Sequence, residues 1–256
     1  MTYEEKIAKL NEYVKKFDNI VFFGGAGVST ESGIPDFRSV DGLYNQKYDY
    51  PPETILSHTF YMRNREEFYR FYRDKMLCTT AQPNKAHLKL AELEKAGKLR
   101  AVVTQNIDGL HQAAGSKTVY ELHGSVLRNY CEGCGEFYDL DYMVNYPENV
   151  PLCRKCGKPI KPDVVLYEEG LDQGTISASV RAISQAQMLI IGGTSLAVYP
   201  AAGLIDYFNG EALVVINKAP TQRDVQADLL ISAPIGEVFS QIEDRYLSRH
   251  TANKII

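Results

Sequence analysis

Short apolar runs of strand length recur along this chain, and the stretches between them place apolar residues every three or four positions. Uninterrupted apolar runs are typical of parallel strands buried on both faces, and the second spacing is typical of helices that cover such a sheet. The alternation therefore predicts an α/β fold with a doubly wound, Rossmann-like parallel sheet. The predicted strands are Ile20–Phe23, Arg100–Thr104, Val164–Tyr167, Met188–Ile191, Leu213–Ile216 and Leu229–Ile231.

Three helices are predicted to pack on this sheet. Thr2 and Glu5 have the spacing of a capping box, which favours a helix at the amino terminus. A second helix runs from Asn84 to a glycine end at Gly97, and a third covers Gly236–Leu247. The residues expected to face the sheet are Ile7, Leu10, Val14 and Phe17 in the first helix, and Val238, Phe239, Ile242 and Tyr246 in the last.

Two segments interrupt the strand and helix alternation. Residues 40–80 are rich in Tyr, Phe, Arg and Glu, and we expect a helical insertion whose aromatic side chains mostly pack in a core. Residues 126–160 contain two cysteine pairs and are predicted to form a small zinc-binding module. The remaining residues, 1–39, 81–125 and 161–256, are predicted to form one Rossmann-like domain, which suits a chain of 256 residues.

A glycine-rich turn follows the first predicted strand and reads GGAGVSTESGIPDFRS over Gly24–Ser39. Glycines let a backbone approach an anion, and the amides of a following helix would face it, so the turn predicts a nucleotide diphosphate site. The third glycine of the dehydrogenase fingerprint is missing, because Thr30 follows Gly25 and Gly27. This departure disfavours an ordinary hydride-transferring enzyme.

Polar side chains also follow the second predicted strand, in the run Gln105-Asn106-Ile107-Asp108. Ligands bind at the carboxyl ends of strands in open α/β sheets, so these residues are candidates for a site, although the run alone would also suit a capped turn. Gly193, Thr194 and Ser195 after one later strand, and Asn217 after the next, have the same placement. The small polar residues of these turns could donate to phosphate or ribose, and plain turns are the alternative.

Four of the five cysteines form the pairs Cys131-x2-Cys134 and Cys153-x2-Cys156. Four thiolates in two such pairs suit a tetrahedral zinc ion with no open position, which makes the metal structural, and two disulfides are the alternative. A zinc ribbon would also suit a nucleic-acid-binding protein. The net charge of -4 and the acidic residues within the module weigh against that function, and no direct binding of nucleic acid is expected.

No apolar run approaches the ~20 residues of a membrane span, so no membrane partner is expected. The charged start of the chain is unlike a signal peptide. Both observations favour a cytoplasmic location. We also expect the fifth cysteine, Cys78, to be buried.

With these motifs in view, the chain resembles the sirtuin family of NAD-dependent protein deacylases. The resemblance extends over most of the chain and is carried by the glycine motif Gly25–Ser39, the run Gln105–His111, the run Tyr120–Ser125, the cysteine pairs and the segment Pro162–Glu169. It implies NAD as co-substrate, structural zinc, and acetylated lysine in proteins or peptides as substrate. In the reaction that it implies, the acetyl group passes from lysine to ADP-ribose and nicotinamide is released.

The resemblance also assigns residues. His123 would be the general base that deprotonates a ribose hydroxyl, and Asn106 and Asp108 would be catalytic residues at the ribose and the nicotinamide. The implied cofactor-binding residues are Gly25, Ala26, Gly27, Thr30, Phe37, Arg38, Gln105, Asn106, Ile107, Asp108, His123, Gly193, Thr194, Ser195, Asn217 and Ile235. NAD-dependent mono-ADP-ribosyl transfer is the alternative within enzymes, because it also begins with the departure of nicotinamide.

Two departures from the family pattern concern the substrate, whose implied contacts are Val165, Leu166, Tyr167, Glu168 and Val198. Tyr167-Glu168-Glu169 stands where the family pattern is Phe-Gly-Glu, which puts the local backbone geometry in doubt and adds a charge. That charge predicts a preference for basic residues beside the acetyl-lysine. The Tyr-x-x-Arg pair of sirtuins that remove acidic acyl groups is out of register in the insertion, where Tyr69 and Tyr72 have the spacing, and this favours a neutral acyl group such as acetyl.

Overall fold

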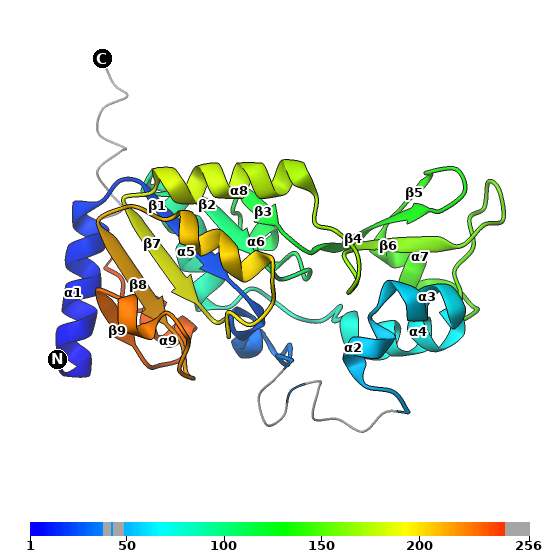
Figure 1. The fold of residues 1–256 in the computed structure, drawn as a ribbon, viewed down its shortest axis with the longest axis horizontal. Coiled ribbons are helices and arrows are strands. Elements are labelled where there is room, and N and C mark those ends of the chain that lie inside the picture. The colour runs from blue at the N-terminus through cyan, green and yellow to red at the C-terminus, as the bar shows by residue number, and fades with distance from the viewer. Residues whose placement is uncertain (38–41, 43–48, 244–256) are drawn as a thin grey trace, which may run out of the picture.

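A computed structural model of the chain describes residues 1–37, 42 and 49–243 (Figure 1). Its main sheet has six strands in the order β3-β2-β1-β7-β8-β9, and every neighbouring pair is parallel. This is the order of a doubly wound fold and confirms the predicted fold class. The strands are β1 (Ile20–Gly24), β2 (Leu99–Thr104), β3 (Val119–Glu121), β7 (Met188–Gly192), β8 (Ala212–Ile216) and β9 (Leu229–Ile231).

Successive strand residues point to opposite faces of this sheet, and on both faces they are apolar and buried. Helices therefore cover both faces. Phe22 packs in a core beneath α1 (Tyr3–Lys16), α5 (Lys85–Lys95) and α9 (Ile235–Phe239). Its neighbour Phe23 packs in a second core, beneath α8 (Gln173–Gln185) and the 3-10 helix Ala201–Tyr207. Both phenylalanines are fully buried, so each anchors one layer.

The predicted start of the first helix is confirmed. The Glu5 amide donates to Thr2 Oγ1 over 3.3 Å, and the Thr2 amide donates to Glu5 Oε2 over 2.7 Å, which completes the capping box. The four residues expected on its inner face are all buried, namely Ile7, Leu10, Val14 and Phe17.

The second part of the fold lies at the end of the molecule opposite α1 (Figure 1). A three-stranded antiparallel sheet, in the order β5-β4-β6, is formed by β4 (Gly124–Cys131), β5 (Phe137–Tyr138) and β6 (Ile160–Val164). Beside it are α7 (Leu140–Asn145), α2 (Pro52–Ile55), α3 (His58–Arg63), α4 (Arg65–Phe71) and the π-helical turn Tyr72–Met76. The remaining short helices are α6 (Leu110–Ala113) and the 3-10 turns Ala26–Val28, Thr30–Ser32 and Asp224–Gln226.

One hydrophobic cluster joins the helices of residues 52–76 to this small sheet. Tyr61, Phe68 and Tyr69 pack in it with Ile160 and Val164, and the Tyr69 hydroxyl donates to the Ile160 carbonyl. The expectation that the insertion's aromatic residues form a core is met by these contacts. The division of the chain at residues 40–80 and 126–160 stays a prediction.

Three predicted elements are wrong in detail. Val164–Tyr167 is not a strand of the parallel sheet: β6 ends at Val164 and pairs antiparallel with β4, and the sixth parallel strand is instead β3. The final helix ends at Phe239, although Val238, Phe239 and Ile242 are buried as expected, and Tyr246 lies outside the described residues. The glycine turn leads into two 3-10 turns, so no α-helix begins there.

Candidate active site

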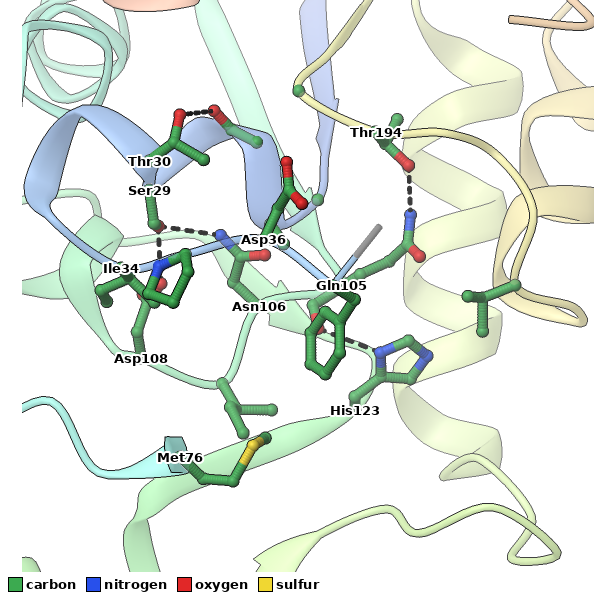
Figure 2. A pocket seen from close by; sticks show the side chains of 18 of the residues that line it. Ser29, Thr30, Ile34, Asp36, Met76, Gln105, Asn106, Asp108, His123 and Thr194 are labelled. Atoms are coloured by element: carbon green, nitrogen blue, oxygen red, sulfur yellow. Dashed lines mark hydrogen bonds between the residues drawn. The ribbon is translucent and has the colours of Figure 1, made fainter. Parts of the chain in front are cut away.

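A cleft of about 1050 Å³ opens where the carboxyl ends of β1 and β7 meet, which is the point at which the strand order reverses. The turns that follow β1, β2, β7 and β8 line one side of it, and segments from the small sheet and the insertion line the other. Figure 2 shows the polar side chains converging on this cleft. A cavity of this size and position suits a dinucleotide.

The two glycine turns of the cleft pack against each other. The Gly27 amide donates to the Gly193 carbonyl over 2.8 Å, and a Cβ on Gly27 would lie 2.8 Å from that oxygen. A Cβ on Gly25 would lie 2.9 Å from Thr194 Cβ. Close approach of two loops therefore requires these glycines, and with no α-helix after them the expected helix N-terminus at the phosphate site is wrong.

A buried hydrogen-bond network joins the turn after β1 to the turn after β2 (Figure 2). The Ser29 hydroxyl donates to Asp108 Oδ2 over 2.6 Å and accepts from Asn106 Nδ2 over 3.0 Å. The Leu110 amide donates to Asp108 Oδ1 over 2.9 Å. Ser29 was not among the predicted site residues, although it stands between Gly27 and Thr30 in the glycine motif, and that placement was the available signal.

His123 lies across the cleft from this network (Figure 2). Its Nδ1 lies 3.0 Å from the Gln105 carbonyl oxygen, which can only accept, so Nδ1 carries the proton and Nε2 keeps its lone pair. Burial lowers the pKa of His123 below its ordinary value of 6.5, against a smaller opposing effect of the Gln105 hydrogen bond. The imidazole is therefore a neutral base at neutral pH.

The side chain of Gln105 connects to the opposite turn, because its Nε2 donates to Thr194 Oγ1 over 3.1 Å. Thr194 Oγ1 in turn accepts from the Leu196 amide over 3.2 Å. Gln105 thus contacts His123 through its backbone and the turn after β7 through its side chain. These bonds fix the relative positions of three loops around the cleft.

The structure brings the predicted cofactor and peptide residues together in this one cleft. Phe37, Ile107, Val198 and Ile235 line it, and so does the segment Val165–Glu168. Of all the residues predicted to bind cofactor or substrate, Arg38 alone lies outside the described part of the chain. His87 and His111 do not line the cleft; they are buried beneath it, with ring centroids 4.7 Å apart.

The four paired cysteines also come together. The Sγ atoms of Cys131, Cys134, Cys153 and Cys156 all lie within 4.8 Å of one another. Around them, the Tyr138 hydroxyl and the Lys155 amide donate to Cys153 Sγ, and the Gly133 amide donates to Cys131 Sγ. Four thiolates with such outer hydrogen bonds fit a tetrahedral zinc ion that keeps no open position. Cys78 is exposed, so its predicted burial is wrong.

Basic residues of the small sheet are paired with acids of the same region. Arg128 Nε lies 2.8 Å from Asp163 Oδ2, and its Nη1 lies 2.8 Å from Glu121 Oε2. Lys155 Nζ lies 3.1 Å from Glu136 Oε2. These pairs offset part of the positive charge of Arg128 and Lys155. Among the described residues, no helix has the length and apolarity needed to cross a bilayer.

The fold and the site together define a Rossmann-type nucleotide-binding protein with a partly buried histidine in its cleft and a four-cysteine cluster that fits a metal ion. Comparison with known proteins places it more closely: the model of the Sir2 family matches residues 25–200. The chain belongs to the Sir2 family, as its motifs indicated.

Relatives and solved structures agree with this assignment. The chain is 59% identical over 240 residues to an NAD-dependent protein deacetylase of Clostridium acetobutylicum, covering 93% of this chain and 98% of that protein. It is 58% identical to one of Clostridium perfringens, covering 94% of this chain and 100% of that protein. A structure of Sir2 with deacetylated p53 peptide and O-acetyl ADP-ribose has a TM-score of 0.86 at 37% identity and covers 93% of this chain and 98% of its own.

Proposed function

We propose that this protein is an NAD-dependent protein lysine deacetylase that transfers the acetyl group of acetyl-lysine to ADP-ribose and releases nicotinamide. The relatives of high identity carry this activity in their names, and Sir2 structures hold NAD with a p53 peptide. The observation that carries the proposal is the juxtaposition of the His123 base and the Asn106-Asp108 pair in one cleft.

Each polar group has a role in this reaction. NAD supplies a ribose carbon that becomes electrophilic when nicotinamide leaves. Asp108 is held by Ser29 and by the Leu110 amide, so its carboxylate has a fixed position in the cleft, where it would bind the nicotinamide carboxamide. Asn106 and Gln105 bind the ribose, and His123 accepts a ribose hydroxyl proton at Nε2 because Nδ1 is already committed to the Gln105 carbonyl.

The remaining cofactor contacts come from the turns around the cleft. The phosphates would be held by the two loops that line the cleft, one with Gly25, Ala26, Gly27 and Thr30 and the other with Gly193, Thr194 and Ser195. Asn217 would reach the adenosine ribose, and Ile235 and Phe37 line the same cleft, whereas Arg38, also predicted to bind the cofactor, lies outside the described residues. In the metal site, zinc has a structural role only.

The acetylated peptide lies along Val165–Glu168, with Val198 on its other side, and draws affinity from backbone hydrogen bonds.

The cleft favours substrates with a neutral acyl group. Tyr69, Arg70, Tyr72 and Arg73 do not line the cleft, and Tyr69 and Tyr72 are buried in the aromatic cluster instead. From the π-helical turn Tyr72–Met76, Lys75 and Met76 line the cleft, and Lys75 forms an ion pair with Asp74.

We also propose a cytoplasmic location, since free thiolates for zinc require a reducing compartment.

Mass spectrometry of an acetyl-lysine peptide incubated with the protein and NAD tests the proposal. We expect the peptide to lose one acetyl group, nicotinamide to appear in equal amount, and both products to vanish in His123→Ala or without NAD. Zinc content and the melting temperature of the variant serve as controls for folding. Gain of an ADP-ribose group by the peptide would instead establish mono-ADP-ribosyl transfer.

A further inference from the structure

Glu168 has an unusual backbone conformation in the segment that would bind the peptide. Its φ of 76° lies in the left-handed region, which it shares with only one other non-glycine residue of the described chain, Leu196 at 53°. Glu168 is the third residue of a tight turn, closed by the Glu169 amide donating to the Leu166 carbonyl over 3.0 Å. Such a turn favours glycine at this position, so a side chain here must be held by something else.

The Glu168 side chain provides a candidate for that restraint. Its Oε2 accepts from the Thr59 amide over 2.8 Å, which connects the turn to the first turn of α3. The hydrogen bond from Thr59 is also the largest cause that lowers the pKa of Glu168, with His58 and Arg63 adding positive charge nearby. The carboxylate therefore faces the insertion, whereas the sequence alone suggested a charge that faces the peptide.

Neighbouring bonds connect the same two segments. The Tyr167 amide donates to the Leu56 carbonyl and the His58 amide donates to the Tyr167 carbonyl, each over 3.0 Å. Glu169 Oε1 lies 2.9 Å from His58 Nδ1, and its Oε2 accepts from the Leu166 amide over 2.8 Å. Several hydrogen bonds thus join residues 56–59 to residues 166–169. The bond made by the Glu168 side chain is the one at the residue with the strained backbone.

We propose that Glu168 is a positioning residue for the acylated peptide: its carboxylate, bound to the Thr59 amide, holds the turn at Leu166–Glu169 in the conformation that receives the substrate backbone. The inference rests on the proposed function, because it concerns the same peptide site. Glu168 thus acts by holding the turn in place, and not by presenting a charge to the peptide.

Three substitutions separate these properties. Glu168→Gln keeps an oxygen that can accept from Thr59, Glu168→Gly loses the bond but relieves the strain, and Glu168→Ala loses the bond and keeps the strain. We expect the peptide KM to be unchanged in Gln, raised about tenfold in Ala, where the hydrogen bond is lost with nothing to offset it, and raised only about threefold in Gly, where relief of the backbone strain offsets part of that loss. Neither kcat nor the KM for NAD should change by more than about twofold. The exposed Glu148, changed to Ala, is the matched control.

A second measurement needs no activity. In the substrate-free protein, NMR hydrogen exchange of the Thr59 amide should be faster in Glu168→Ala than in the wild type and unchanged in Glu168→Gln. If the Thr59 amide exchanges at the same rate in all variants, or if the Gln variant has the KM of the Ala variant and loses a preference for basic flanking residues, the inference is overturned. Absence of deacetylation by the wild-type protein would overturn the proposed function, and it would do so whatever the exchange rates show.

Discussion

The proposed role of His123 as a base depends on a single backbone contact. The Gln105 carbonyl selects the tautomer, and partial burial favours the neutral ring, so the lone pair on Nε2 is present at neutral pH without help from a carboxylate. This differs from sites in which an acid raises the histidine pKa. The pH dependence of the reaction should show that difference.

We expect kcat/KM for the peptide to be flat above neutral pH and to fall in acid with a midpoint below 6.5. The sign follows from the lowered pKa of His123, because the reactive neutral form is lost only when the pH falls through that pKa. A pH profile of initial rates at limiting peptide tests this. A midpoint above 7 would mean that a nearby negative charge, and not burial, governs the ring.

Ser29 is the second residue whose contacts predict a large effect. Ser29→Ala removes the donor to Asp108 Oδ2, in a partly buried position, and the acceptor for the buried Asn106 Nδ2. Loss of a hydrogen bond to a charged group costs about 1.5–3 kcal/mol, so nicotinamide release should slow by about tenfold or more. Ser184→Ala, on the surface of α8, is the control. Equal rates for the two variants would contradict the role given to the network.

At the scale of elements, two buried histidines link stability to pH. Burial lowers the pKa of His87 to about 4 and that of His111 to about 3, so the folded protein keeps both neutral where the unfolded chain takes up protons. Stability should therefore fall as the pH drops below about 6.5, with a slope approaching about 2.7 kcal/mol per pH unit for two protons. Urea unfolding at several pH values measures this slope. His111→Phe should reduce it by about half, and an unchanged slope would exclude the pair as its source.

The small sheet should depend on its metal. Structural zinc contributes about 10–16 kcal/mol to folding of small domains, far more than three short strands gain by packing alone. We expect Cys131→Ser, or a strong chelator, to remove zinc and lower the melting temperature of the chain. Deacetylation should be lost with it, because β4 begins at Gly124, next to His123, and β6 leads into the peptide segment. Full activity in zinc-free protein would contradict this coupling.

Elements differ in how well their sequences predict them. The runs at β1, β7 and β8 are long and wholly apolar on a buried sheet, and they were predicted within a residue or two. The short edge strand β3 was missed because Val119, Tyr120 and Glu121 are each only partly buried and form no apolar run. Val164–Tyr167 reads as a strand by composition, but its partners are β4 and residues 56–58, which no local pattern reveals.

At the scale of the whole molecule, the cleft gathers residues that are far apart in the sequence. That the predicted cofactor and peptide positions meet in one cleft could be expected from the sequence, because each follows a recognisable strand or motif. Two hydrogen bonds could not be predicted, one between Ser29 and Asp108 and one between Glu168 and Thr59. Each joins two segments whose approach depends on the complete fold.

Ligand binding across this cleft should stabilise the whole molecule. NAD at a concentration of 100 times its dissociation constant should add about 2.7 kcal/mol, which corresponds to an increase of roughly 5–10 °C in melting temperature. Thermal shift measurements with NAD and with an equal concentration of nicotinamide alone would test this. His123→Ala should retain the increase, since its loss affects proton transfer more than the turns that bind the phosphates.

The shared aromatic cluster has a consequence for motion. Since Tyr61, Phe68 and Tyr69 interlock with Ile160 and Val164, the insertion and the cysteine module cannot swing separately without exposing large rings to water. Any widening or narrowing of the mouth between them and the six-stranded sheet must then be a concerted rotation of one rigid lobe. The proposed peptide segment Val165–Glu168 follows β6 and would move with that lobe, so the width of the peptide site between it and Val198 would change with the same rotation.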